Sequence, residues 1–231
     1  MRGGRLAVLV GAATVALRAV ALADADSPTP GTLCVGCAAD VEAVRRSYTR
    51  DQWAELTRGE VVQSEDDGDT AAHGPKRVAA SALIPYPPEP VWQVVTDFES
   101  RPQFVPGAKE VRILRTEGDR LWVSEHLHAF FMDVRFVTIV TLDPAHGRVS
   151  WVMDHEAAHD IADTTGSWEV VPLQDRRVTL VRYRTTVDSG KAVPGFLERF
   201  FTARSLPKMV AGVRHQVQRR FPLLQAERFA D

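Results

Sequence analysis

The feature that most constrains this fold is a series of short strand-like segments separated by short polar turns. Six segments between residues 110 and 187 alternate apolar and polar side chains or are rich in β-branched residues, as strands are. The predicted strands are 110–114, 121–128, 134–142, 148–153, 166–171 and 178–187. Because parallel pairing needs crossovers of a dozen or more residues, mostly short connections favour an antiparallel sheet.

Helical patterns flank this series. A strand over 78–84 ends at a Pro-rich stop, and Pro88 suits the first turn of a helix over residues 89–98. The longest helical pattern runs over 194–220, where Pro207 is expected to kink or divide it. This order predicts an α+β fold, in which a curved antiparallel sheet wraps around a long C-terminal helix.

The first 23 residues have the features of a secretory signal peptide. Two arginines precede an apolar stretch, and Ala21-Leu22-Ala23 forms a small-x-small cleavage site. We therefore expect export to the periplasm or the medium. The chain of 231 residues has a net charge of −2, and removal of residues 1–23 takes away three arginines and no acid. An acidic mature chain argues against nucleic acid as a partner.

The only two cysteines are close together, in Cys34-Val35-Gly36-Cys37. Haem attachment would need His at the next position, which is Ala38, and a zinc site would need two more ligands nearby. In an oxidising compartment, a local disulfide between Cys34 and Cys37 is the favoured interpretation.

The remaining segments complete the predicted organisation. Residues 24–75 form an N-terminal extension with the cysteine pair, one or two short amphipathic helices over 40–58, and a polar loop over 64–75. The main domain follows over 76–221, and 222–231 is a short tail.

Two motifs lie in the first part of that domain. Residues 87–92 read Pro-Pro-Glu-Pro-Val-Trp, and residues 97–106 read Asp-Phe-Glu-Ser-Arg-Pro-Gln-Phe-Val-Pro. Gly166-Ser167-Trp168-Glu169-Val170 and Val193-Pro194-Gly195-Phe196 follow in the same order as in a known family. In these motifs and in its order of elements, the chain resembles the START-like (SRPBCC) superfamily of polyketide cyclases/dehydrases and lipid-transfer proteins, over about residues 76–221.

This resemblance implies a helix-grip fold with an apolar cavity between the sheet and the last helix. The expected partner is a hydrophobic small molecule or lipid, with transient membrane contact as an accompanying option, no cofactor, no metal, and a monomer as the favoured state. Because no single catalytic motif defines the superfamily, the resemblance assigns no catalytic residue.

Candidate cavity residues are the aromatic and apolar side chains of the strands and last helix, with one histidine. They are Trp122, His126, Phe136, Trp151, Trp168, Tyr183, Phe196, Phe200 and Met209. For strand 121–128 two registers remain open, since either the Trp122/His126 set or the intervening set can face inward.

The sequence His155-Glu156-Ala157-Ala158-His159 matches the HExxH zinc-protease motif. That chemistry requires a helix, which brings both histidines to one metal ion. Here the motif follows a predicted strand, and in an extended chain residues four apart would lie about 13 Å apart. We therefore expect a polar strand end or loop, with a position at the rim of the cavity as one option.

Three functions remain open at this stage. The leading hypothesis is an exported, non-catalytic carrier of a lipid-like or polycyclic ligand. The second is a polyketide cyclase or dehydratase that uses a cavity His126, His128 or Asp154 as acid or base. The third is an envelope interaction module with a packed interior.

Overall fold

The computed structural model describes residues 41–65, 77–129, 132–173, 176–188, 190 and 205–222. The elements are α1 (Val41–Arg46), α2 (Arg50–Thr57), β1 (Val62–Glu65), β2 (Arg77–Ile84), α3 (Pro88–Thr96), the 3₁₀ helix η1 (Phe98–Gln103), β3 (Ala108–Glu117), β4 (Arg120–Ala129), β5 (Met132–Asp143), the 3₁₀ turn η2 (Pro144–His146), β6 (Arg148–Met153), β7 (Asp163–Leu173), β8 (Val178–Asp188) and α5 (Ser205–Arg220). The predicted signal peptide, Cys34, Cys37, Phe196 and Phe200 lie outside the described residues.

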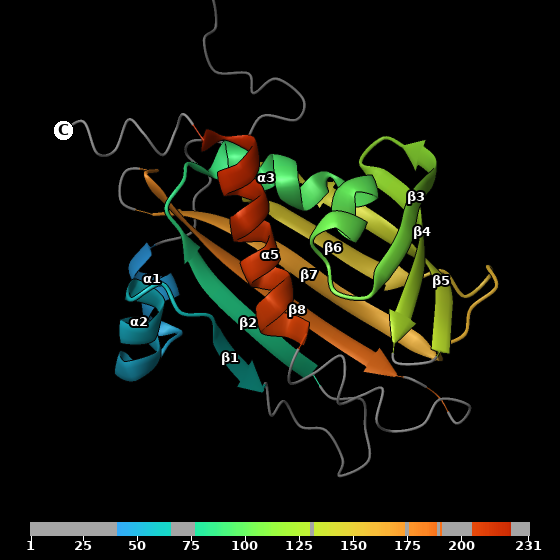
Figure 1. Ribbon diagram of the computed structural model, residues 1–231, viewed down its shortest axis with the longest axis horizontal. Helices are drawn as coiled ribbons and strands as arrows, with labels where there is room; N and C mark the ends of the chain where they lie inside the picture. The colour runs from blue at the N-terminus through green and yellow to red at the C-terminus, as the bar shows by residue number, and fades with distance from the viewer. Residues whose placement is uncertain are drawn as a thin grey trace, which may run out of the picture.

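All eight strands form one antiparallel sheet in the order β1-β2-β8-β7-β6-β5-β4-β3. The sheet curves around α5, which crosses one of its faces, with α3 and η1 on the same side (Figure 1). This is the predicted α+β helix-grip architecture. We call the face toward α5 the inner face and the opposite one the outer face.

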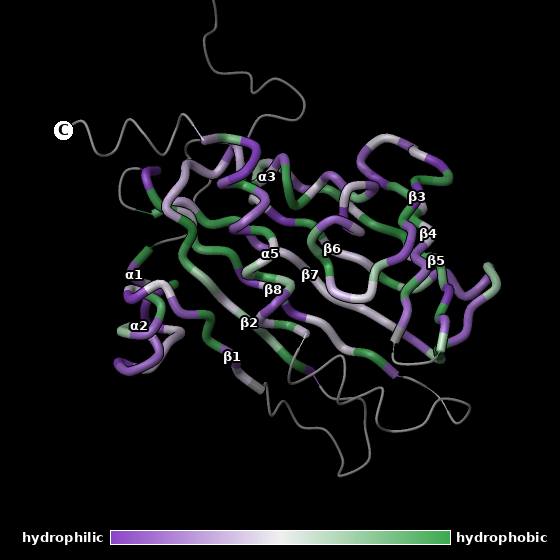
Figure 2. Tube along the Cα trace, viewed as in Figure 1, coloured by the Kyte–Doolittle hydropathy of each residue, from purple (hydrophilic) through white to green (hydrophobic). Residues whose placement is uncertain are grey.

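Strand alternation assigns each side chain to one of these faces. In the β4–β5 pair, Val123 faces Thr138 and Glu125 faces Phe136 on the inner face. The intervening pairs, such as Trp122 with Ile139, lie on the outer face. Hydrophilic and hydrophobic residues are accordingly interleaved along these strands (Figure 2).

The main core lies between the inner face and the helices α3 and α5. Val91 and Val94 of α3 are fully buried, as is Val210 of α5. Close approach to α5 depends on Gly212, because a Cβ there would lie 2.4 Å from the carbonyl oxygen of Phe104. The helix therefore rests directly on the loop that follows η1.

The N-terminal helices cover part of the outer face. Leu56 of α2 is fully buried in a second cluster that includes Leu180 of β8. The Tyr48 hydroxyl donates a 2.8 Å hydrogen bond to Ser81 Oγ on β2. A capping box between Thr49 and Gln52 starts α2. This extension is thus packed on the domain by apolar and polar contacts.

The observed elements confirm the predicted strand order and most strand positions. Pro207 is the third residue of α5 and so does not divide the part of the helix that the structure describes. A proline in the first turn is tolerated because that amide has no partner within the helix. None of the described helices is long and apolar enough to cross a membrane.

Candidate functional site

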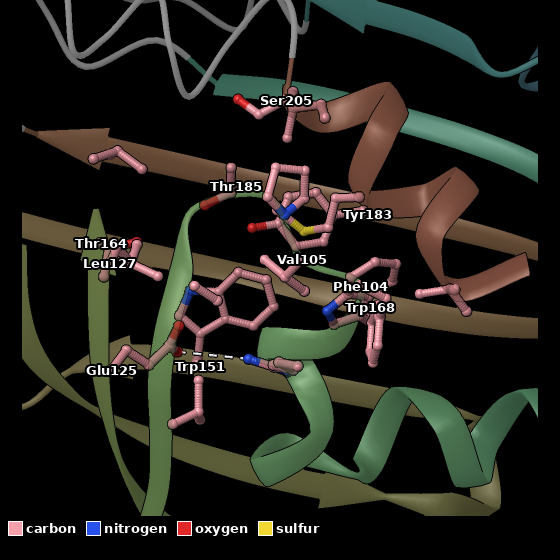
Figure 3. Close-up of a pocket in the computed structure, with 18 of the residues that line it drawn as sticks. Phe104, Val105, Glu125, Leu127, Trp151, Thr164, Trp168, Tyr183, Thr185 and Ser205 are labelled. Carbon is pink, nitrogen blue, oxygen red and sulfur yellow. Dashed lines mark ion pairs between the residues drawn. The ribbon is translucent and has the colours of Figure 1, made fainter. Parts of the chain in front are cut away.

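A cavity of about 80 Å³ lies between α5 and the inner face of the sheet. Its walls come from the strands β3 to β8, from α3, η1 and α5, and from the loop that follows η1 (Figure 3). Leu206, Met209 and Val213 of α5 and Phe104 and Val105 of the loop are among the lining residues. Most of the lining is apolar, so the site favours ligands with little polar surface.

Three aromatic side chains form one wall of this cavity. Tyr183 stacks on Trp151 with ring centroids 5.4 Å apart, and it contacts Trp168 at 4.5 Å. Gly166 makes this arrangement possible, since a Cβ there would lie 2.2 Å from the Trp151 ring. These rings give the wall a rigid apolar surface.

One ion pair interrupts the apolar lining. Arg101 of η1 and Glu125 of β4 both face the cavity, and Arg101 Nη1 lies 3.5 Å from Glu125 Oε1 (Figure 3). Their side chains are only 14% and 17% exposed. Burial raises the pKa of Glu125, while the charge of Arg101 and hydrogen bonding to Thr138 oppose that shift. The pair therefore supplies a buried donor and a buried acceptor.

Hydroxyl groups add weaker polar contacts to the cavity. Burial raises the pKa of Tyr183 to about 12, so its phenol stays neutral and can donate a hydrogen bond. Thr164, Thr185 and Ser205 also line the space. A ligand with one polar end could be oriented by these groups and by the Arg101–Glu125 pair.

Five of the predicted cavity residues surround this space: Phe136, Trp151, Trp168, Tyr183 and Met209. Their contact with a ligand stays a prediction. Phe196 and Phe200 cannot be placed, because they lie outside the described residues.

The inward orientation predicted for Trp122 and His126 is wrong. β4 adopts the opposite register, so that Val123, Glu125 and Leu127 face inward. On the outer face, the guanidinium of Arg115 lies 3.6 Å from the Trp122 ring centroid, and His126 Nε2 lies 3.2 Å from Asp133 Oδ1. Arginine stacking covers the large indole, which removes the need to bury it in the core.

Neither Arg101 nor Glu125 is among the residues that the sequence predicts for the cavity. Arg101 belongs to the Asp-Phe-Glu-Ser-Arg-Pro motif. Its guanidinium carbon lies 4.4 Å from the centroid of the Phe98 ring. Glu125 belongs to the intervening set of strand 121–128, which faces inward in the second of the two open registers. Its position between two apolar inward residues, Val123 and Leu127, is the signal that could have identified it.

The HExxH sequence lies in the turn between β6 and β7 and is not helical. The segment is a loop, as expected, and the rings of His155 and His159 lie 5.8 Å apart. The spacing of about 13 Å belongs to an extended chain and does not apply to this turn. His159 Nδ1 contacts the carbonyl of Ile161, and Ile161 itself lines the cavity. The turn therefore borders the cavity. No cluster suited to a metal ion occurs among the residues that the structure describes.

Three comparisons with known proteins bear on this site. The sequence pattern of the family described as "Polyketide cyclase / dehydrase and lipid transport" matches residues 84–214. No curated protein matches the chain.

Solved structures match the fold at low sequence identity. The ZhuI aromatase/cyclase from Streptomyces sp. R1128 aligns with a TM-score of 0.54 and 18% identity, over 62% of this chain and 94% of its own. The STAR-related lipid transfer protein from Xanthomonas axonopodis gives 0.58 and 14%, over 68% and 93%. Human STARD10 gives 0.59 and 11%, over 79% and 76%. At these identities the likeness establishes the fold alone.

Proposed function

Because the chain belongs to the polyketide cyclase / dehydrase and lipid transport family, we propose that it binds a lipid-like or polycyclic molecule in the cavity beneath α5 and carries it without covalent chemistry. The observation that supports this most is the cavity itself, whose apolar lining contains one buried ion pair. Apolar burial would supply the affinity, at about 25 cal/mol per Å² removed from water. The Arg101–Glu125 pair would orient a polar end of the ligand.

The size of the cavity sets a condition on binding. Its volume of about 80 Å³ is smaller than the roughly 300–1,000 Å³ of most ligand sites. A lipid-sized ligand therefore requires lining side chains to move aside. Met209 is suited to this, because its unbranched thioether chain has several rotatable bonds. Phe104 is the second candidate, since it belongs to a loop rather than to the sheet.

Mass spectrometry of the molecules that co-purify with the full chain tests this proposal. We expect an apolar molecule in stoichiometric amount with the wild-type protein. Leu127→Trp places an indole in the cavity, so this variant should carry at least tenfold less. Val152→Trp is the matched control, because Val152 is 50% exposed, and it should carry the wild-type amount. Absence of any apolar molecule, or equal loading of both variants, would contradict the proposal.

We also propose that the protein acts outside the cytoplasm. The charged start, apolar middle and Ala21-Leu22-Ala23 site of residues 1–23 support this. Expression of the full chain with a C-terminal tag, followed by fractionation and N-terminal sequencing, tests it. We expect a mature chain beginning at Asp24; an intact cytoplasmic chain would contradict export.

An enzymatic function of the cyclase/dehydratase type is the second candidate, and Glu125 is the observation that favours it. The residues first considered for acid–base work do not serve, since His126 and His128 lie on the outer face and Asp154 lies outside the cavity lining. Glu125 is buried with a raised pKa beside Arg101. A carboxyl in such a position can exchange a proton with a bound polyketide-like substrate. Turnover that is lost in Glu125→Gln while ligand binding is retained would favour this candidate over the carrier.

A further inference from the structure

A basin of about 370 Å³ lies on the outer face of the sheet, behind the cavity. Gly166 is among its lining residues, in the part of the sheet where strands β6, β7 and β8 are neighbours. Trp151 and Thr185 line both spaces, so only the thickness of the sheet separates them. The apolar ligand does not occupy this basin in the proposed function.

The basin is lined by positive charge and hydroxyl groups. Arg148 of β6, Arg184 of β8 and Arg77 of β2 contribute guanidinium groups. Thr165, Ser167 and Thr186 contribute hydroxyls, and Thr165 pairs directly with Thr186 across β7 and β8. None of the described residues that line the basin carries a carboxylate. Guanidinium and hydroxyl groups are the donors that proteins use for phosphate-type anions.

Glu169 is the acid that pairs with the arginines of β6 and β8 beside the basin. Glu169 Oε1 lies 2.8 Å from Arg184 Nη1 and 4.0 Å from Arg148 Nη1, and its Oε2 lies 2.9 Å from Arg182 Nε. One carboxylate thus serves three guanidinium groups. Asp143 is opposite Arg148 in the strand register, but its carboxylate binds the His146 ring at 2.8 Å. Arg148 and Arg184 thus share one carboxylate, so their guanidinium groups keep N–H donors for a further anion.

Access to the basin is open. The Arg148 side chain is 53% exposed and the Arg184 side chain 38% exposed, so both can turn toward a ligand. By contrast, Glu169 is only 15% exposed and is held by its arginine contacts. Arg148 Nη1 lies 4.0 Å from Glu169 Oε1, at the limit of ion-pair distance. The N–H donors of the Arg148 guanidinium are therefore available to a second anion.

We propose that this outer basin binds a phosphate-type oxyanion, held mainly by Arg148 and Arg184 with the hydroxyls of Thr165, Ser167 and Thr186. The ligand would be either a free phosphate compound or the headgroup of an anionic lipid, which present the same chemistry.

Inorganic phosphate is the first probe, titrated into the full chain at constant ionic strength and followed by calorimetry and thermal unfolding. We expect saturable binding and a concentration-dependent rise in Tm. Arg148→Gln should weaken phosphate binding about tenfold, because a charge-assisted hydrogen bond is lost. Arg120→Gln is the matched control, an exposed arginine of the outer face that does not line the basin, and it should change binding less than about twofold. Unchanged unfolding of both variants without phosphate verifies that each is folded.

Vesicles distinguish the two sources of phosphate. Co-sedimentation with phosphatidylcholine vesicles that contain phosphatidylglycerol, lost in Arg148→Gln and absent with phosphatidylcholine alone, would identify a lipid headgroup. Binding of inorganic phosphate without vesicle binding would identify a soluble compound. Absence of both, or equal weakening by the two substitutions, would overturn the proposal. The carrier function is tested separately, since Arg148→Gln should retain the co-purifying apolar molecule.

Discussion

The two faces of the sheet are built from the same strands and yet offer opposite chemistry. Along β4, Val123, Glu125 and Leu127 face a cavity with one buried ion pair, whereas Trp122 and His126 lie on the outer face. The outer face carries many arginines: Arg112, Arg115, Arg120, Arg135, Arg148 and Arg184. Charged side chains are rare on the inner face, because burying a charge costs free energy, so a charged group that is present there points to a particular role. Charged side chains are abundant and largely solvated on the outer face, so a single one contributes little and only a cluster of like charges indicates a binding site.

The largest effect should come from separating the inner ion pair. Arg101→Met leaves the Glu125 carboxylate buried without its partner, and we expect a loss of about 3 kcal/mol in the free energy of unfolding. The double variant Arg101→Met/Glu125→Met removes both charges and should recover most of that loss. Urea denaturation with a double-mutant cycle measures the coupling. Additive losses would contradict a coupled pair.

Filling the space at Gly166 should have the next largest effect. Gly166→Ala places a Cβ 2.2 Å from the Trp151 ring and 2.4 Å from the Arg184 carbonyl oxygen. We expect a loss of about 2 kcal/mol in unfolding free energy, because backbone and ring must both shift. Thr165→Ala, the neighbour on the outer face, should cost less than about 0.5 kcal/mol. Equal costs would show that the two faces do not differ here.

The pH dependence of stability sharpens the comparison further. Burial raises the pKa of Glu125 in the folded protein, so the folded state holds this proton above the unfolded pKa of about 4.3. Its contribution is present below the unfolded pKa and is lost as pH rises through the raised pKa. Glu125→Gln removes this titration, so the difference in stability between wild type and variant should change with pH in that window. A constant difference across the window would contradict the raised pKa.

The smallest effect is expected for the outer face. His126→Ala removes a 3.2 Å side-chain contact with the half-exposed Asp133 and should change the free energy of unfolding by less than about 0.5 kcal/mol. The amount of co-purifying apolar molecule should stay the same. A loss of that molecule would return His126 to the cavity.

Much of the fold could be predicted from the sequence, because clear turn residues mark where each strand segment ends. The boundaries of β6 coincide with the predicted 148–153, and β8 extends the predicted strand by one residue. The motif at residues 87–106 positioned α3 and the start of the domain. These signals are local, and local signals survive in the folded protein.

The cavity was less predictable, because register depends on partners far away in the sequence. Both faces of β4 mix polar and apolar side chains, and the apolar Trp122 points outward only because Arg115 from β3 and Arg120 cover it. Glu125 is acceptable inside only because Arg101 of η1 meets it there. The alternation of residues within β4 cannot predict these contacts, because the arginines that cover Trp122 and pair with Glu125 are set by the tertiary fold. The turn at 154–162 also brings His155 and His159 together in a way that a straight strand could not.

In the proposed function, apolar ligands bind on the inner face of the sheet and not on the outer one. Tryptophan fluorescence quenching by a dibrominated fatty acid tests it most directly, because bromine quenches only indoles that it contacts. We predict saturable quenching of the wild-type protein that is strongly reduced in the double variant Trp151→Phe/Trp168→Phe, whose two indoles line the cavity, and retained in Trp122→Phe, whose ring lies on the outer face. Quenching that is lost in Trp122→Phe and retained in Trp151→Phe/Trp168→Phe, or no quenching at all, would contradict binding in the cavity.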